Sequence, residues 1–524
     1  MLWLDSKKDI EKLNENQTVY QYNSFQTGEE FPPLADRERI SKYKRLKKLF
    51  QGKQFEVYER ASKLLKDTPH ADQLAQLYIA VNIADILVTK PADLLVGEPP
   101  GFESGLPDNS DQQKAVNRYV EENDLVKLVH ESAIGNGYRG DAWIKTRYGF
   151  RQDFSEVLKI GGSIPAGVTM EPIIEHIGAD CVFPETSRGN VKAFKAVRIA
   201  NVEYVVGKND EKPFLNVERH IPGYIIYERY RLIEFEGGVD TRWGYPLQVY
   251  KIGERVATGR DEDIVETEVP HLLVHHIPYK SIDDDWEGVG GLEKLESLLA
   301  AINDRVVQID YILWKHSDPT AYGPDLDGGG DNQVRLGGAY IPVTNEDKTP
   351  GYMTWDGQLT SAFKELEVLL GLVYQMSETP QWLFGTVLGE NTGGTGTSHT
   401  DSASIKARFM PILSKVHRIR THYDKAIRDA LWTCQLLDIA HGDYDFEAVY
   451  PKINWQDGIP KNYKEEAEIM QLRTGGKPTL DVQSAIKRQD AVDDEKAQEI
   501  ISRIENDEKT VNGFVDSSIF NAGE

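Results

Sequence analysis

Cysteine is scarce in this chain of 524 residues, which contains only Cys181 and Cys434. Two cysteines exclude a disulfide framework and a four-cysteine zinc site, and they fit a reducing compartment. Long apolar runs are missing as well. The best stretch, Leu77 to Val88, is interrupted by an asparagine and an aspartate. No run approaches the roughly 20 residues that a membrane helix needs, so we expect a soluble protein without a membrane segment.

Positive charge is in deficit, because 60 lysines and arginines stand against 84 acids and leave a formal net charge of −24. Phosphate binding needs clustered lysines and arginines, so this balance argues against a protein whose whole surface holds nucleic acid, although a local basic patch is still allowed. The first residues lack the basic-then-apolar order of a signal peptide. A hydrophobic content of 40% over this length predicts folded structure, in roughly three domains.

The sequence motifs of common enzymes are also absent. The closest match to a phosphate-binding loop runs from Gly389 to Gly394, but Thr395 follows where the lysine must stand. Without that lysine no charge holds the terminal phosphates, which argues against nucleotide hydrolysis. The chain has no Gly-x-Ser-x-Gly turn and no His-Glu-x-x-His pair. We therefore expect no enzyme activity, no catalytic residue and no cofactor.

The N-terminal part reads as helices followed by a sheet. Residues 36–66 hold eleven lysines and arginines against four acids, with helical apolar spacing and Gly52 as a stop. Further helices are predicted over about 71–96 and 111–135. From about 141 to 276, short runs of β-branched and aromatic residues alternate with turn residues. This pattern predicts an antiparallel sheet.

The C-terminal part reads as long helices separated by small modules. An apolar stripe covering an arc of roughly 120° begins after Gly291 and predicts a helix of some two dozen residues. Its residues are Leu292, Leu295, Leu298, Leu299, Ile302, Val306, Ile309 and Leu313. A Gly-rich, strand-like module over 319–357 and a second helix come next. After the loop 381–400, another helical pattern contains Pro411, which predicts a kink.

The final part of the chain is predicted from shorter patterns. A strand is expected from Glu447 to Trp455, charged helices beyond Pro460, and a frayed tail over the last fifteen residues.

Several clusters allow both a functional and a plain structural interpretation. His271, His275 and His276 could bind a metal ion, but a half-buried strand with locally satisfied histidines is favoured. The acidic run 283–285 could hold a divalent ion or be a solvated turn near the start of the following helix. Residues 325–327 resemble the opening of a calcium loop whose remaining ligands are missing. We therefore predict no metal site.

Charge is distributed unevenly, and this too has two interpretations. The segment 404–432 carries seven cations against two acids, whereas 261–298 carries eleven acids against two lysines. Opposite charges on separate segments suggest contacts between subunits as readily as DNA binding. The basic segment 36–66 could touch nucleic acid or pair with acidic neighbours. The loop 381–400 is either a plain connector or a moving loop that faces a ligand.

The order of these elements, and several stretches of residues, resemble the portal proteins of tailed bacteriophages with long non-contractile tails. The stretches are 39–60, 90–99 (KPADLLVGEP), 288–303, 453–460, 466–476 and 492–495 (VDDE). The resemblance covers about residues 36–508, and the succession of stretches carries it rather than any one of them. It implies an α+β portal fold with long stem helices, an antiparallel β wing, a small α/β clip and a helical crown.

The resemblance divides the chain into eight parts. They are a flexible N-terminal segment (1–35), the N-terminal wing (36–290), a stem helix (291–318), the clip (319–357), a second stem helix (358–378), the tunnel loop (379–400), the rest of the wing with the kinked helix and return strand (401–460), and the crown and tail (461–524). This tunnel loop is longer than expected for the family and rich in glycine and threonine.

The resemblance also implies a function and sites. The chain would form a twelve-subunit ring at one capsid vertex of the virion, assembled in the host cytoplasm, through which double-stranded DNA passes without sequence specificity. The implied partners are the terminase large subunit, a head-completion or adaptor protein, and the major capsid and scaffolding proteins. The tunnel-loop residues facing DNA would be Glu390, Asn391, Thr392, Thr395, Thr397, Ser398 and His399. The stem channel face would hold Glu293, Asp304 and Gln308, and the clip would bind partners through Tyr322, Asp325, Asp327, Asp331 and Tyr340.

Two other functions remain open from the sequence. One is a DNA-packaging or DNA-processing enzyme, and the other is a virion scaffold protein without a channel. Ring formation around a central hole would distinguish a portal subunit from the scaffold protein. An ATPase or nuclease assay would distinguish a portal subunit from the enzyme.

Overall fold

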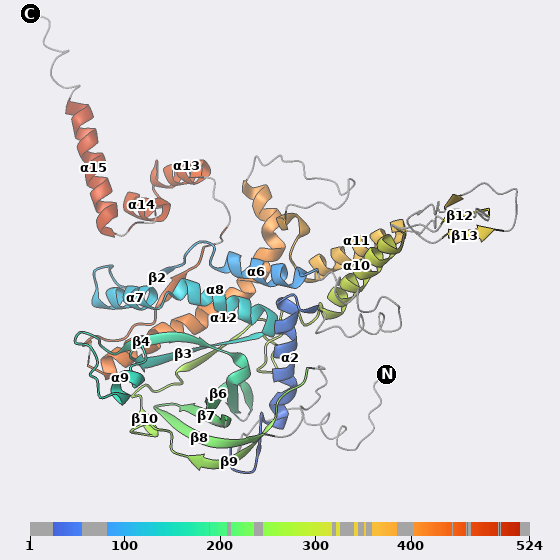
Figure 1. The fold of residues 1–524 in the computed structure, drawn as a ribbon. Helices are drawn as coiled ribbons and strands as arrows, with labels where there is room; N and C mark the ends of the chain where they lie inside the picture. The colour runs from blue at the N-terminus through green and yellow to red at the C-terminus, as the bar shows by residue number, and fades with distance from the viewer. Residues whose placement is uncertain are drawn as a thin grey trace, which may run out of the picture.

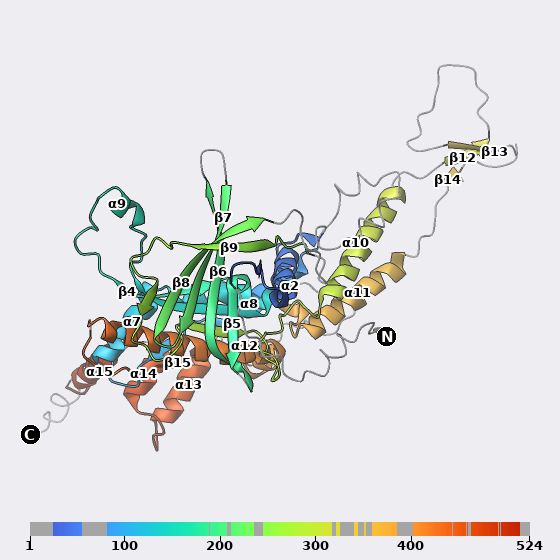
Figure 2. The same ribbon diagram turned by 90° about the horizontal axis from the view of Figure 1, so that it is seen from below.

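The structure is a computed structural model in which a body of antiparallel sheets and helices carries a projecting pair of helices (Figures 1 and 2). The residues that it describes are 25–54, 81–187, 189–206, 211–234, 245–316, 321–324, 340–343, 351–352, 359–384, 402–442, 444–456, 458, 463–490, 492 and 494–513.

The larger sheet of the body is built from seven antiparallel strands, as the sequence of this region predicts. The strands are β1 (Glu30–Phe31), β5 (Val182–Ser187), β6 (Asn190–Val206), β7 (Glu211–Ile221), β8 (Tyr224–Glu234), β9 (Tyr250–Val256) and β10 (Ile264–Glu266). Their order is β1-β9-β8-β7-β6-β5, and β10 pairs with β8. Register shifts interrupt the β5–β6 and β8–β9 pairs. Such irregularities increase the local twist, and the sheet is visibly curled (Figure 2).

A smaller sheet lies between this one and the long helix α12 (Ser402–Ala440). Its three strands, in the order β11-β3-β4, are β3 (Asp141–Gly149), β4 (Glu171–Ile177) and β11 (Val274–Pro278). The apolar face of α12 packs on these strands, and Tyr423 and Ile427 are fully buried with Ile144 and Ile277. The helix agrees with the helical pattern predicted after the loop 381–400, and its apolar stripe explains its burial.

Helices α2 (Leu34–Phe50), α6 (Ile83–Leu95), α7 (Asp111–Glu122) and α8 (Leu125–Arg139) complete the N-terminal half of the body. Helix α2 ends at Phe50, just before the predicted stop at Gly52, whose φ of +77° favours glycine. The prediction of one helix over 111–135 is wrong, since Asp124 takes a left-handed φ of +44° and separates α7 from α8. The buried Asn123 amide binds Tyr119 and β4 at this break.

Two antiparallel helices, α10 (Glu296–His316) and α11 (Leu359–Met376), project from the body and carry three short strands at their far end (Figures 1 and 2). The strands are β12 (Ala321–Pro324), β13 (Tyr340–Val343) and β14 (Gly351–Tyr352). Strand β12 pairs in parallel with β13 and antiparallel with β14. We call α10, α11 and these strands the hairpin. It matches the predicted pair of helices around a small strand module.

The start of α10 differs from the prediction, because residues 291–295 form turns and the regular helix begins at Glu296. The preceding glycines explain the difference. A Cβ atom on Gly288 would overlap the carbonyl oxygen of Gly140, and one on Gly290 would lie 2.9 Å from that of Tyr138. This close contact between two backbones holds the segment in place before the helix starts. The acidic run 283–285 therefore lies well before the helix N-terminus that it was expected to favour.

The remaining elements are short or lie in the C-terminal region. They are β2 (Gly101–Glu103), α9 (Ser155–Lys159), the 3-10 turns η1 (Ala179–Cys181) and η2 (Gln381–Phe384), β15 (Lys452–Asn454), α13 (Tyr463–Thr474), α14 (Val482–Asp490) and α15 (Asp494–Gly513). The strand expected over 447–455 shrinks to β15, because its partner β2 offers only three residues. Of the last fifteen residues, which were expected to be frayed, 510–513 belong to α15 and the others lie outside the described residues. None of the described helices is long and apolar enough to cross a membrane.

Candidate functional site

The inner face of the hairpin is a continuous apolar contact. Leu299 and Ile302 of α10 are buried with Val373 of α11, and Leu366 and Leu370 pack against them. Across the helices, Arg305 of α10 donates a hydrogen bond of 2.6 Å to Glu365 of α11. Most of the predicted stripe of each helix therefore faces inward, but Leu313 of α10 and Phe363 of α11, which the same patterns include, are about half exposed.

The outer face of α11 carries a second apolar stripe, made of Val368, Leu372 and Met376. These residues are four positions apart and so share one face of the helix. They are 52%, 41% and 54% exposed, respectively, in the single chain. Leu313 of α10 is also about half exposed. A contiguous apolar stripe on a projecting element is typical of a surface that another protein chain covers.

The three residues assigned to the channel face of the stem occupy different environments. Glu293 lies in the turn before α10, with Lys42 Nζ 3.7 Å from its carboxylate. Asp304, inside α10, is buried at 9% exposure, and Gln308 is exposed and accepts a hydrogen bond of 2.8 Å from Arg305. Of these three residues, only Gln308 therefore is exposed within the single chain, and the channel assignment of all three stays a prediction.

The assigned partner-binding residues lie at the tip of the hairpin. Tyr322 is half-buried in β12, and its ring lies against Gly351 of β14. Tyr340 is the first residue of β13 and pairs with Ala321, which precedes Tyr322 in β12. The structure thus brings these two residues onto adjacent strands. Asp325, Asp327 and Asp331 lie outside the described residues.

The tunnel-loop assignment and the kink concern the chain between η2 and α12. All seven tunnel-loop residues, from Glu390 to His399, lie outside the described residues. Pro411 is exposed and lies inside α12, which continues on both sides of it. The kink at Pro411 stays a prediction.

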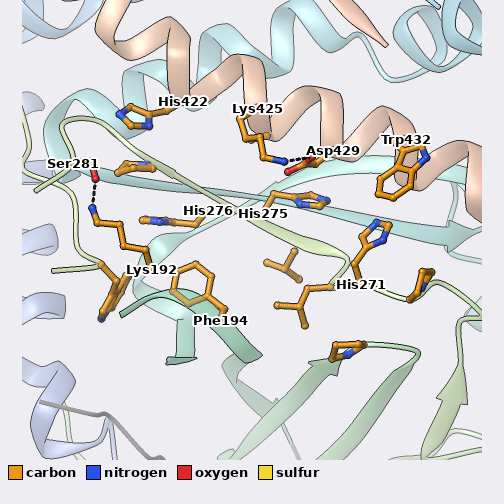
Figure 3. A pocket seen from close by; sticks show the side chains of 17 residues that line it. Lys192, Phe194, His271, His275, His276, Ser281, His422, Lys425, Asp429 and Trp432 are labelled. Atoms are coloured by element: carbon orange, nitrogen blue, oxygen red, sulfur yellow. Dashed lines mark hydrogen bonds and ion pairs between the residues drawn. The ribbon is translucent and has the colours of Figure 1, made fainter. Parts of the chain in front are cut away.

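The predicted histidine group lines a cavity of about 640 Å³ between β11 and α12 (Figure 3). Helix α12 lines one side of the cavity with four side chains spaced three or four residues apart, those of His422, Lys425, Asp429 and Trp432 (Figure 3). Lys192 and Phe194 of β6 close the opposite side, where the Lys192 ammonium donates a hydrogen bond to Ser281. We call this cavity the histidine groove.

Two of the three histidines predicted from the sequence have local partners, in agreement with the favoured structural interpretation. The His271 ring stacks on Trp432 at 4.7 Å and hydrogen-bonds Thr433 at 2.9 Å. His276 Nε2 lies 2.7 Å from the buried carboxylate of Asp141. That carboxylate also accepts hydrogen bonds from the Tyr43 hydroxyl and the Gly288 amide, so it joins α2, β3 and the chain before α10.

His275, between them, is the exception. Its Nε2 atom is buried and has no hydrogen-bond partner among the described residues. Burial lowers the pKa of His275 to about 4, an effect that the nearby carboxylate of Asp429 opposes. The ring is therefore neutral at pH 7. Within the described part of the chain, no three histidine, cysteine or acidic side chains come together as a metal site.

Several basic side chains of the charged segments form ion pairs with acidic side chains of the same chain. Lys42 of α2 lies 3.4 Å from Glu287, and Arg45 of α2 contacts Glu296 at 2.5 Å. In α12, Arg428 lies 3.2 Å from Asp424 on the preceding turn. For the described residues of the basic segment 36–66, pairing with acidic neighbours is therefore the interpretation that the structure supports.

The sequence analysis missed the outer stripe of α11, although the spacing of four residues between its members is visible in the sequence. It also missed the residues of α12 in the histidine groove, because they approach β11 only through the fold.

The chain matches no protein-family model, and a search of curated proteins found no similar sequence.

Proposed function

We propose that this chain is a subunit of a ring-shaped phage portal at one vertex of the capsid. In this role the ring forms the channel for packaging and ejecting DNA, and it docks the terminase motor and the head-completion proteins. The observation that carries the proposal is the projecting hairpin with apolar residues on both faces of α11. The resemblance of the sequence to portal proteins is the second, independent support.

The outer stripe has a physical use in a ring. One chain buries the inner stripe of the hairpin but leaves Val368, Leu372 and Met376 in water. When identical subunits stand side by side around an axis, each hairpin covers part of the next, and all subunits bury the same surface. In a single chain this exposed stripe would favour aggregation, whereas a closed ring uses it fully.

The proposal assigns the parts of the portal fold to described elements. Helices α10 and α11 act as the stem, β12, β13 and β14 belong to the clip, and the body sheets with α12 form the wing. Helices α13 to α15 belong to the crown. The projecting end of the hairpin then supplies the docking surface for other virion proteins, with Tyr322 and Tyr340 on it.

The acidity of the chain suits this role. A channel through which DNA slides must not neutralise many phosphates, because each contact adds affinity and resists movement. Much of the positive charge of α2 is already paired within the chain. The net charge of −24 therefore leaves a ring that repels the DNA backbone more than it holds it.

Light scattering on the purified protein tests the proposal. A ring of twelve chains of 59.2 kDa has a mass of about 710 kDa, from twelve times the chain mass. The same sample should show neither ATPase nor nuclease activity. A monomer at all protein and salt concentrations contradicts the proposal, and robust ATP or DNA hydrolysis would favour a packaging or processing enzyme instead.

A further inference from the structure

A small cavity of about 100 Å³ lies where the hairpin joins the body. Four segments that are distant in the sequence meet there: the chain after β11, the turn before α10, the end of α11 and the middle of α12. Their polar or charged side chains at the cavity are those of Tyr279, Lys280, Lys294, Ser377, Glu378, Lys415 and Arg418. No motif in the sequence marks this site, since only the fold assembles it.

The charges at this cavity do not balance. Four cationic side chains face it, against the single carboxylate of Glu378. Arg418 already holds both oxygens of that carboxylate, at 2.8 and 2.7 Å. Three lysines, Lys280, Lys294 and Lys415, therefore line the cavity without a second carboxylate.

Lys415 is the buried member of this group, with only 6% of its surface exposed. Its ammonium donates a hydrogen bond of 3.0 Å to the backbone carbonyl of Ser377. An ammonium carries three donors, so a further acceptor in the cavity can still be bound. Burial lowers its pKa to about 8, because the loss of water outweighs the attraction of Glu378. An added anion would reverse that effect.

We propose that this cavity binds a tetrahedral oxyanion, a phosphate or sulfate group, through Lys415 with Lys280 and Lys294 at its mouth. The size is suitable, since a cavity needs only about 10–15 Å³ for each water molecule and this one holds several. A doubly charged phosphate offsets two of the three lysines. The group comes either from free phosphate, which can carry two negative charges, or from the backbone of DNA, whose phosphodiester carries one. Both sources present charged phosphoryl oxygens in a tetrahedral arrangement.

Binding would also connect the hairpin to the body. Lys294 stands before α10, Lys280 follows β11 and Lys415 belongs to α12, so one anion bridges segments that otherwise repel each other. We expect the bound anion to raise the unfolding temperature, by an amount that grows with the logarithm of its concentration once this exceeds the dissociation constant. This inference concerns the single chain and does not depend on the proposed portal function.

The test is calorimetric titration of inorganic phosphate into the purified full-length protein at constant ionic strength. We expect saturable binding with one site per chain, and an affinity at least tenfold lower in Lys415→Met. The matched control is Lys159→Met, which removes an exposed lysine that pairs only with Glu156 on α9 among the described residues, and which should bind as the original protein does. Should Lys415→Met fail to fold, the exposed pair Lys280→Gln and Lys294→Gln supplies the same comparison.

Absence of saturable binding to the original protein overturns the proposal. So does binding that Lys415→Met, or the double variant in its place, leaves unchanged. A short DNA duplex distinguishes the sources of the phosphate group. If the duplex displaces inorganic phosphate and needs Lys415 to do so, the site accepts backbone phosphate. If it does not compete, the site is reserved for the free anion. A duplex that binds independently of Lys415, with no phosphate binding at all, contradicts the assignment.

Discussion

Replacing Leu372 by glutamate should disassemble the proposed ring, and the effect can be worked out from its exposure. Complete burial of a leucine side chain stabilises by about 1.5–3 kcal/mol. Because 41% of Leu372 remains exposed in the single chain, a neighbour that covers it adds about 1 kcal/mol per interface. A glutamate loses this gain and moves a carboxylate out of water, which costs several kcal/mol more. Together these terms weaken each interface by about 3–5 kcal/mol, which is a factor of about 10²–10⁴ in the association constant.

Sedimentation velocity over a range of concentrations measures this loss. We expect Leu372→Glu to give monomers or open fragments with an unchanged circular dichroism spectrum, whereas the volume-conserving Leu372→Met keeps the ring. The control is Ile160→Glu, at a position that is 82% exposed next to α9, far from the hairpin (Figure 2). A Leu372→Glu protein that assembles like the original at the same concentrations refutes the argument that the outer stripe is the ring contact.

Three further predictions concern the body. Pro411→Ala restores a backbone donor within α12, so it should straighten the helix and impair DNA packaging while the subunit stays folded; normal packaging would contradict this account of the helix. Asp141→Ala leaves three hydrogen-bond donors without their buried acceptor, so it should lower the free energy of unfolding, measured by urea denaturation, by about 3–5 kcal/mol. The control Asp283→Ala, at an exposed position, should change this free energy little. The pKa of His275 is about 4 in the folded protein and about 6.5 in the unfolded chain. Between these two pH values, His275 is protonated in the unfolded chain and neutral in the folded protein. Stability should fall by about 2–3 kcal/mol as the pH drops through this range, and by clearly less in His275→Gln; equal slopes would show that His275 is not the group responsible.

The hairpin shows how far sequence patterns reach. The apolar stripe from Leu292 to Ile309 predicts a long helix, and the structure buries its inner positions against α11 as expected. The start of that helix was not predictable, because it depends on the contact of Gly288 with Gly140, about 150 positions away in the sequence. Helical periodicity records local geometry, whereas close backbone contacts between distant glycines leave no periodic signal.

The candidate sites divide in the same way. The histidine group was visible as three nearby residues, but its partners Thr433 and Asp141 come from other elements. The cationic cavity was invisible, because Lys415 and Glu378 are ordinary charged residues until the fold brings four segments together. The uneven charge was correctly noticed, yet only the structure shows that Lys42 and its neighbours pair within the chain.

The most direct test of the central claim is an electron-microscope image of the purified full-length protein. Averaged end-on views should show closed rings of subunits around an open axis, and side views should show the hairpins gathered at one end. Compact single particles, or closed assemblies without an axial opening, would contradict the proposal that this chain forms a channel for DNA.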